Sequence, residues 1–306
     1  MLKNIVIFGS KSILAKNFLE RSELKNCKII KISHKKISND VIECDFGDLL
    51  TTEKLKNLCS TLKKELIHSE TIFILFAWVG GPRTIDLNKD TWSKNINIIL
   101  NFKKTCEIII PSRIIYLSSA GAIYPQNIRN HYFKEIDPPS PKGIYGKQKY
   151  LSEEFINCFS KANNLKLTIL RISSAYGFDK RFCDQGVINK WLFSAILNKK
   201  IDLYNSIDSE INFISFEQIS SAIIVSIQKQ INGTYNIGSL KSIALKSILE
   251  EIKSLSGKRL EINRVNNDDR FFHLDTSKFI KASGLKFEIN LAKDIKLIYK
   301  KIQSFI

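Results

Sequence analysis

Short runs of isoleucine, valine, leucine and phenylalanine alternate with helical patterns over the first half of the chain, and this alternation restricts the fold more than any other feature. The predicted strands cover residues 5–8, 28–32, 41–44, 71–76, 113–118 and 166–171. The predicted helices cover residues 12–21, 51–66, 90–108 and 145–162. Nearly continuous apolar strands separated by helices are typical of a doubly wound parallel sheet. We therefore expect an α/β protein.

The remainder of the chain, beyond about residue 177, has a looser pattern. Helices are predicted near 186–198, 217–230, 242–256 and from about 291, with short strands near 201–204 and 211–214. Ligands of doubly wound folds bind at the carboxyl ends of the strands. We expect this second part to form a smaller lobe that closes over that edge of the sheet, with some elements returning to the first domain.

The composition restricts the partners. The 306 residues, 44% of them hydrophobic, suffice for one large domain or two closely joined ones. The net charge is +17, but the lysines are spread along the whole chain, so we expect no nucleic-acid partner. A basic field should instead attract anionic cofactors and phosphate-bearing substrates.

The cysteine spacing and the length of the apolar stretches argue against disulfide-rich, metal-binding and membrane-spanning classes of protein. The six cysteines, at 27, 44, 59, 106, 158 and 183, form no CxxC pair and the four histidines are scattered, so no disulfide framework and no metal site are expected. The chain begins with a core strand and has no signal-peptide layout. Its longest apolar stretch, residues 72–79, is too short to span a bilayer. We expect a cytoplasmic protein without membrane insertion.

The first predicted strand ends at Gly9, and a helical pattern follows directly. In a nucleotide-binding unit such a turn lets the backbone approach a pyrophosphate, and the helix N-terminus offers unpaired N–H groups. Only the first position of the usual glycine pattern is glycine, since Ser12 and Ala15 occupy the others. An ordinary first strand and helix of an α/β protein is the alternative. The candidate cofactor-binding residues of this turn are Gly9, Lys11, Ser12, Ile13 and Leu14.

Tyr145 and Lys149 lie four residues apart in a predicted helix, which places both side chains on one helix face. An ammonium beside a phenol favours the phenolate, so Lys149 is expected to lower the pKa of Tyr145 toward neutrality. A serine pair, Ser118 and Ser119, ends the fifth predicted strand. Together these groups are the acid/base equipment of an enzyme that interconverts carbonyl and alcohol.

Ordered sequence blocks resemble one family, the extended short-chain dehydrogenase/reductase superfamily, in its NAD(P)-dependent epimerase/dehydratase branch that acts on nucleotide sugars. The blocks are the first strand and turn, CDFGDL at 44–49, FILFAWVGG at 73–81, WSKNINIIL at 92–100, YLSSAGAIYP at 116–125, YGKQK at 145–149 and LRISSAYG at 170–177. The resemblance implies a Rossmann-type sheet, with residues 1–176 as the NAD(P)-binding domain and 177–306 as mainly the substrate-binding lobe. Bacterial surface-polysaccharide synthesis is the commonest setting of such relatives.

The resemblance assigns catalytic roles. Tyr145 would exchange a proton with the sugar oxygen, and Lys149 would bind the nicotinamide ribose and lower the tyrosine pKa. Ser119 would hydrogen-bond the reacting oxygen, with Ser118 as the alternative. These three residues, Ser119, Tyr145 and Lys149, are the candidate catalytic group.

The resemblance also assigns further cofactor contacts. Asp45 and Phe46 would lie near the adenine, and Phe76, Ala77 and Trp78 where the fourth strand passes the cofactor. Asn95 is a further candidate cofactor contact. Two alternatives remain open, since Asp45 could cap a helix and Asn95 could be a structural helix residue.

The end of the second predicted strand bears on cofactor choice. NAD sites often place an acid there, whereas this chain has Ser33, His34, Lys35 and Lys36. A hydroxyl and cations suit the 2′-phosphate of NADP, and Lys11 could help. NADP(H) is therefore preferred, with NAD(H) possible. A solvated basic loop is the alternative explanation.

A preference for NADPH favours reduction of a 4-keto nucleotide sugar. The alternatives are an NAD-dependent nucleotide-sugar 4-epimerase and a non-catalytic, cofactor-sensing Rossmann protein. Relatives often hold the substrate through an arginine and an acid that Ile211 and Asn212 replace here. Arg264 or Arg270 could substitute, although a surface salt bridge would explain either one. A homodimer through the helices near 90–108 and 145–160 is expected from the resemblance.

Overall fold

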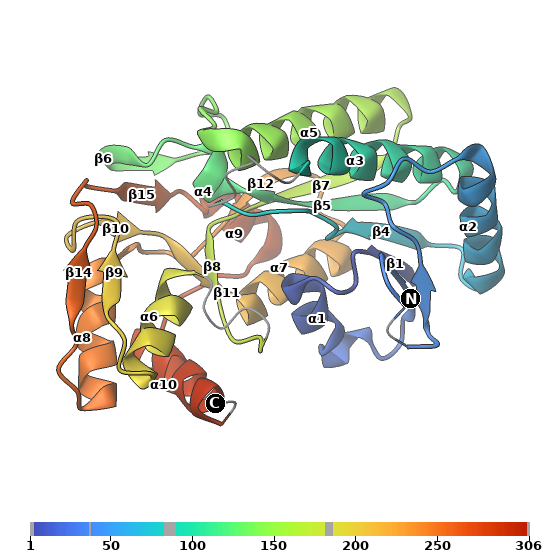
Figure 1. Cartoon of the computed structure of the whole chain (residues 1–306). Coiled ribbons are helices and arrows are strands. Elements are labelled where there is room, and N and C mark those ends of the chain that lie inside the picture. Colours follow the sequence, from blue (N-terminus) through green and yellow to red (C-terminus); the bar gives the residue numbers. More distant parts are fainter. Residues whose placement is uncertain (1–2, 37, 83–89, 181–185, 305–306) are drawn as a thin grey trace. The chain divides into compact units, whose positions relative to one another are not determined.

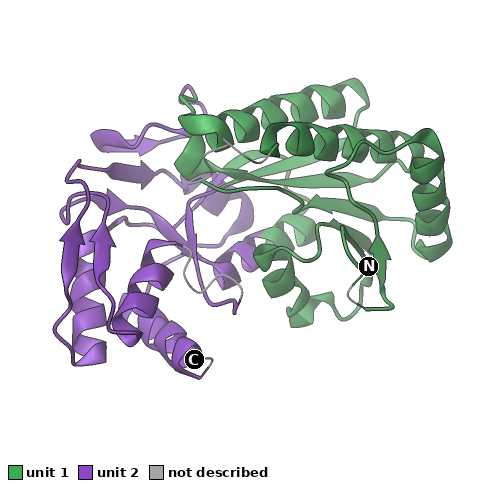
Figure 2. Cartoon of the chain, viewed as in Figure 1, with its two compact units in different colours: residues 1–123, 139–171, 223–235 green, residues 124–138, 172–222, 236–306 purple. Residues whose placement is uncertain are grey.

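The computed structural model describes residues 3–36, 38–82, 90–180 and 186–304. The chain divides into two compact units, which interleave along the sequence (Figure 2). Unit 1 comprises Met1–Ile123, Pro139–Arg171 and Ile223–Tyr235. Unit 2 comprises Tyr124–Pro138, Ile172–Ala222 and Asn236–Ile306. Elements beyond residue 177 thus return to the first unit, while the assignment of cofactor and substrate binding to residues 1–176 and 177–306 stays a prediction.

Unit 1 is built on a seven-stranded sheet with the order β12-β7-β5-β4-β1-β2-β3. The strands are β1 (Asn4–Phe8), β2 (Lys28–Ser33), β3 (Val41–Glu43), β4 (Thr71–Leu75), β5 (Arg113–Ser119), β7 (Lys166–Ile172) and β12 (Gly233–Ile237). β1 pairs in parallel with both β2 and β4, and every residue of β1 and β4 is buried. The strand order therefore reverses between β1 and β4, the place where a doubly wound sheet opens for a ligand.

Helices cover both faces of this sheet (Figure 1). The helices of unit 1 are α1 (Ile13–Leu19), the 3-10 helix η1 (Ser22–Leu24), α2 (Thr52–Glu65), α3 (Thr91–Ile108), α4 (Ala120–Ile123) and α5 (Gly143–Ala162), together with the part of α7 (Phe216–Gln228) that begins at Ile223. α3 and α5 lie side by side on one face, and α1 lies on the other (Figure 1). The rings of Phe46, Phe73 and Phe102 surround Phe8 at 5.3, 5.0 and 4.9 Å between centroids and form the core under the carboxyl end of β1.

Unit 2 contains three small sheets. A four-stranded sheet has the order β13-β10-β15-β6, formed by β13 (Ile243–Ala244), β10 (Glu210–Ile211), β15 (Phe271–Leu274) and β6 (Asn127–Phe133). Two further pairs join β8 (Ser174–Tyr176) to β11 (Phe213–Ser215) and β9 (Ile201–Leu203) to β14 (Ile262–Arg264). The helices of this unit are α6 (Val187–Ile196), α8 (Leu245–Ser256), α9 (Ser277–Ser283) and α10 (Leu291–Gln303).

The structure confirms the α/β fold with a parallel central sheet. The six strands predicted in the first part all form, with ends within one residue of the prediction. The seventh strand, β12, was not predicted, because five residues that begin with glycine show little strand pattern. β6 was also missed, since six of its seven residues are exposed and the strand exists through pairing with β15, far along the chain.

Candidate active site

Gly9 lies where the chains leaving β1 and β4 meet. Its φ angle is +87°, and a Cβ atom there would lie 2.5 Å from both N and Cα of Ala77. The N–H groups of Phe76 and Ala77 both donate to the carbonyl oxygen of Phe8 at 2.8 Å. Only glycine fits this close approach without moving backbone. The structure therefore brings Gly9, Phe76 and Ala77 together at the carboxyl edge of the sheet, and their contacts with a cofactor stay predictions.

The other residues of the first turn have separate tasks. Ser12 is the N-cap of α1, because its hydroxyl accepts from the N–H of Ala15 at 3.1 Å. Ile13 and Leu14 are the first two residues of α1, and Lys11 before them is partly exposed. The hydroxyl of Ser12 is thus engaged by the helix itself, and cofactor contacts for these residues stay predictions.

Two buried hydroxyls at this edge indicate that polar ligand atoms fit there. Ser10 follows β1 and Ser33 ends β2, and they are only 3% and 2% exposed. Among the described residues neither hydroxyl oxygen has a hydrogen-bond partner. Buried polar groups are nearly always hydrogen-bonded in native proteins, so sugar hydroxyls or phosphates of a dinucleotide would satisfy both. Ser10 was not singled out from the sequence, although its place directly after Gly9 was a usable signal.

The segment between β3 and α2 also reaches this edge. Asp45 is exposed and its carboxylate accepts from the N–H of Gly47 at 2.8 Å. It caps no helix, since Thr51 is the N-cap of α2. Phe46 is buried against Phe8, so its side chain is a core residue. An adenine contact at Asp45 and Phe46 stays a prediction.

Asparagines of α3 hold the segments that border the site. Asn95 accepts from the N–H of Val79 at 2.9 Å and donates to its carbonyl at 3.0 Å, and it also donates to Gln148 at 2.8 Å. The buried Asn101 donates to the carbonyls of Phe46 and Asp48. These contacts favour the structural alternative for Asn95. The sequence did not reveal Asn101, although a polar residue between the apolar residues of a helix was a signal.

Tyr145 and Ser119 meet where β5 ends and α5 begins. The hydrogen bond with the Ser119 side chain lowers the pKa of Tyr145, but burial of the phenol outweighs it and raises the pKa to about 12. Ser118 points to the other face of β5, as alternation requires, and its buried hydroxyl has no partner among the described residues. The structure therefore brings Ser119, and not Ser118, to the tyrosine.

Lys149 is buried one turn further along α5. Its ammonium donates to the carbonyl of Leu117 at 3.0 Å and lies 3.8 Å from the centre of the Trp78 ring. Burial lowers the pKa of Lys149 to about 7, with Glu153 opposing this shift. The expectation that Lys149 lowers the pKa of Tyr145 was wrong, because burial dominates both groups and Ser119 is the neighbour that acts on the phenol.

The end of β2 and the arginines of unit 2 complete the predicted site residues. His34 and Lys35 are exposed directly after Ser33. Arg264 is exposed at the end of β14 and Arg270 is partly exposed before β15. Both arginines belong to unit 2, and their contact with a substrate stays a prediction.

The two residues that replace the family's arginine and acid are structural here. Ile211 is buried in β10, and the side chain of Asn212 donates to the carbonyl of Ser239 at 2.9 Å and accepts from its N–H at 3.1 Å.

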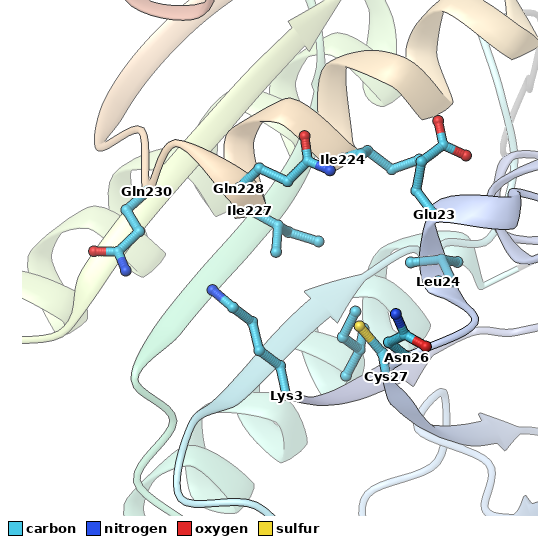
Figure 3. Close-up of a pocket in the computed structure, with 10 residues that line it drawn as sticks. Lys3, Glu23, Leu24, Asn26, Cys27, Ile224, Ile227, Gln228 and Gln230 are labelled. Atoms are coloured by element: carbon cyan, nitrogen blue, oxygen red, sulfur yellow. The ribbon is translucent and has the colours of Figure 1, made fainter. Parts of the chain in front are cut away.

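A separate cavity of about 630 Å³ lies at the opposite edge of the sheet of unit 1 (Figure 3). Lys3 directly precedes β1 and Cys27 directly precedes β2, so the cavity opens at the amino ends of these strands. Its lining residues are Lys3, Ile5, Glu23, Leu24, Asn26, Cys27, Ile224, Ile227, Gln228 and Gln230. None of the candidate site residues lines it.

The described residues lack the features of two other classes of protein. No described helix combines the length and the apolar character that crossing a membrane requires. In the same ranges no three His, Cys, Asp or Glu side chains gather in a group that could hold a metal ion. Five cysteines are unpaired thiols, and Cys183 lies outside the described residues.

A parallel sheet that opens at a glycine turn, with Ser119, Tyr145 and Lys149 grouped at its carboxyl edge, defines a Rossmann-type protein equipped for proton transfer. The chain belongs to the NAD dependent epimerase/dehydratase family, whose model matches residues 5–238. This membership supports the prediction of an enzyme that uses a nicotinamide dinucleotide.

Individual relatives share part of the chain. The dTDP-4-dehydro-6-deoxyglucose reductase of Escherichia coli is 29% identical over 196 residues, 62% of this chain and 61% of that protein. The dTDP-L-rhamnose 4-epimerase of Burkholderia thailandensis is 24% identical over 164 residues, 51% of this chain and 45% of that protein. The chain thus spans less than two thirds of the length of these curated relatives.

Solved structures show the same fold over the whole chain. The UDP-glucose 4-epimerase of Thermotoga maritima, solved with UDP-glucose, has a TM-score of 0.84 at 19% identity and covers 98% of this chain and 99% of its own. The UDP-glucuronic acid 4-epimerase of Bacillus cereus, solved with UDP-glucuronic acid and NAD, has a TM-score of 0.84 at 16% identity and covers 99% and 100%.

Proposed function

We propose that the chain is an NADPH-dependent reductase of a 4-keto nucleotide sugar, with Ser119, Tyr145 and Lys149 as its catalytic residues. The observation that carries this proposal is the meeting of Tyr145 and Ser119 at the carboxyl edge of a dinucleotide-binding sheet, with Lys149 buried one turn behind. The reductase of Escherichia coli supports the substrate class.

The protonation of Tyr145 suits reduction. A pKa of about 12 keeps the phenol protonated at neutral pH, so it can donate a proton to the oxygen of a keto group. The Ser119 hydroxyl would hydrogen-bond the same oxygen and polarise it. A nicotinamide dinucleotide, when bound, supplies the hydride. An epimerase must also take a proton from a sugar hydroxyl, for which a phenol of raised pKa is less well prepared.

The charges at the end of β2 support NADPH. Ser33 is buried with an unpartnered hydroxyl among the described residues, and the exposed His34 and Lys35 follow it. We propose that these groups bind the 2′-phosphate of the adenosine ribose. Lys11 would contribute a further cation.

An NAD-dependent 4-epimerase is the second candidate, and one observation favours it. Glu43 of β3 is the register partner of Ser33, so an exposed carboxylate stands beside the end of β2. A carboxylate in this region is typical of NAD sites, because it accepts hydrogen bonds from the ribose 2′-hydroxyl. The epimerase of Burkholderia thailandensis is consistent with this candidate.

The test is incubation with a panel of 4-keto nucleotide sugars and either NADPH or NADH, following the absorbance of the reduced nicotinamide and identifying the product. A reductase consumes one cofactor per sugar and prefers NADPH. An epimerase interconverts two sugar nucleotides without net cofactor consumption. Binding of cofactor with neither reaction would point to the non-catalytic cofactor sensor.

We further propose that Arg264 and Arg270 of unit 2 bind the diphosphate of the substrate, and that the chain forms a homodimer. Four large apolar side chains on the outer faces of two neighbouring helices support the dimer. Trp92 and Ile96 on α3 are 40% and 41% exposed, and Leu151 and Phe155 on α5 are 57% and 38% exposed. Large exposed apolar patches often mark sites of association between proteins.

A further inference from the structure

The ammonium of Lys149 is enclosed by groups from three elements of unit 1. Besides the carbonyl of Leu117 on β5 and the ring of Trp78 after β4, the ring of Tyr116 lies 5.1 Å away. Only 6% of Lys149 is exposed. Burial of this kind penalises the charged form of a lysine, so an ammonium needs a compensating negative charge. Carbonyl and ring contacts supply partial charge only.

A buried carboxylate, Glu153, lies one turn after Lys149 on α5, and its charge opposes the effect of burial on the pKa of Lys149. Glu153 is 1% exposed and faces Arg171 on β7, which is 6% exposed. The Nε of Arg171 donates to the two carboxylate oxygens at 3.2 and 3.0 Å, and its Nη2 donates to Oε2 at 2.8 Å. A guanidinium that engages both oxygens fixes the direction of the carboxylate. The carboxylate of Glu153 is therefore held in a fixed orientation by Arg171.

We propose that Glu153 is a positioning residue that keeps Lys149 charged for its task at the cofactor ribose, and that Arg171 holds Glu153 in place. This inference rests on the proposed function where it assigns Lys149 to the ribose. Among the described residues, the other ionisable groups near Lys149 are Tyr145 on its own helix, Tyr116 on β5 and Arg171, whose positive charge is paired with Glu153. Both phenols keep their protons at neutral pH, because burial raises their pKa values, so Glu153 is the negative charge that acts on the lysine.

The ring of Trp78 gives a readout that needs neither substrate nor cofactor. The chain has three tryptophans, and an ammonium 3.8 Å from one of them should change its fluorescence when it loses its proton. We expect a fluorescence transition near the pKa of Lys149, about 7. Trp78→Phe and Lys149→Met should each remove it, which identifies the groups responsible.

The decisive comparison is Glu153→Gln against Glu154→Gln. Both variants lose one carboxylate from the same helix at neighbouring positions, but Glu154 is exposed. Loss of an opposite charge near a buried lysine should move the midpoint down by about one pH unit or more in Glu153→Gln. Glu154→Gln should keep the wild-type midpoint. Glu153→Asp retains the carboxylate, so its transition should have a midpoint close to that of wild type.

An unchanged midpoint in a folded Glu153→Gln protein would overturn the inference, as would an equal shift in Glu154→Gln. If Glu153→Gln does not fold, Glu153→Asp and Arg171→Lys test the same point, because each disturbs the contact that orients the carboxylate. Both should lower the midpoint by less than about one pH unit, and a wild-type midpoint in both would overturn the inference. If wild type shows no transition, the pH slope of the free energy of unfolding replaces the fluorescence. Glu153→Gln could shift the midpoint although the wild-type protein has neither reductase nor epimerase activity. That result would support the role of Glu153 and contradict the proposed function.

Discussion

The Tyr145 and Lys149 side chains show how little residue spacing says about protonation. Their separation by four residues correctly placed them on one face of α5, but the pKa values follow from burial. Burial keeps the phenol protonated at neutral pH and lowers the pKa of Lys149 to about 7. The predicted acid/base pair is thus arranged to donate a proton more readily than to accept one.

Replacement of Tyr145 by phenylalanine tests the proton path. We expect turnover to be abolished, with cofactor affinity nearly unchanged, because Phe keeps the ring packed against Trp78 at 6.3 Å and loses only the hydroxyl. Steady-state kinetics and a fluorescence titration with NADPH measure the two effects. Turnover at the wild-type rate would remove Tyr145 from the mechanism. Lys149→Ala should impair both quantities.

The buried Lys149 also predicts how stability depends on pH. Its folded pKa, about 7, lies below the ordinary value of 10.5, so between these values the unfolded chain binds more protons and stability rises with pH. The advantage of wild type over Lys149→Met in unfolding free energy should grow by about 1.4 kcal/mol per pH unit in this window. Urea unfolding of both proteins at several pH values measures it, and parallel pH curves would contradict the assignment.

At the scale of elements, α3 and α5 support the site through side chains that face other segments. Asn95 ties α3 to the segment that carries Trp78 and to Gln148 of α5, and Asn101 holds the loop after β3. α5 in turn approaches α4 so closely that a Cβ on Gly146 would lie 2.3 Å from the carbonyl oxygen of Ala122. The position of Tyr145 therefore depends on contacts between elements.

Gly146→Ala should disturb this approach. The helix itself would gain about 1 kcal/mol from the substitution, but overpacking against backbone costs about 1–3 kcal/mol, so we expect lower stability and slower turnover. Gly81→Ala is the control, because a Cβ there meets no atom within 4 Å. Thermal unfolding and initial rates measure both variants. If Gly146→Ala is as stable and active as the control, α4 can move away from α5 without affecting stability or turnover.

The hydrogen bonds between Asn95 and Val79 can also be tested by substitution. Asn95→Ala leaves the N–H and the carbonyl of Val79 without their side-chain partner, which costs about 1–3 kcal/mol where such groups are buried. We expect weaker binding of NADPH, since Trp78 precedes the released residue. Asn97→Ala, which removes a contact to Gly47 instead, is the matched control. If both variants bind the cofactor as tightly as wild type, Asn95 contributes to the stability of the protein and not to cofactor binding.

At the scale of the whole molecule, the exposed apolar side chains of α3 and α5 predict association of two copies. Leu151→Glu and Phe155→Glu should convert a dimer into a monomer, because a carboxylate in the apolar centre of an interface cannot be solvated. Ile67→Glu is the control, since Ile67 is 65% exposed and lies between α2 and β4, on neither of these helices. Light scattering gives the mass. A monomeric wild-type protein would contradict the proposed dimer.

Local periodicity of apolar residues was sufficient to predict much of the secondary structure. The apolar runs of the first six strands, the turn at Gly9 and the helix that carries Tyr145 and Lys149 all follow from patterns within about twenty residues, and the structure contains each of them. β6, β12 and β15 could not be predicted in this way. Each is short or exposed, and pairing with a distant strand makes it a strand.

The amino-acid sequence by itself determined the parallel α/β architecture and which chemical groups could meet, because strand and helix periods and a four-residue spacing are local properties. Only the tertiary structure decided the protonation of Tyr145 and Lys149, the choice of Ser119 over Ser118, the clamp made by Asn95 and the pairing of Glu153 with Arg171. These depend on burial and on contacts between segments far apart in the chain. A residue's neighbours in space, and not its neighbours in sequence, set the dielectric surroundings and hydrogen bonds that control a proton.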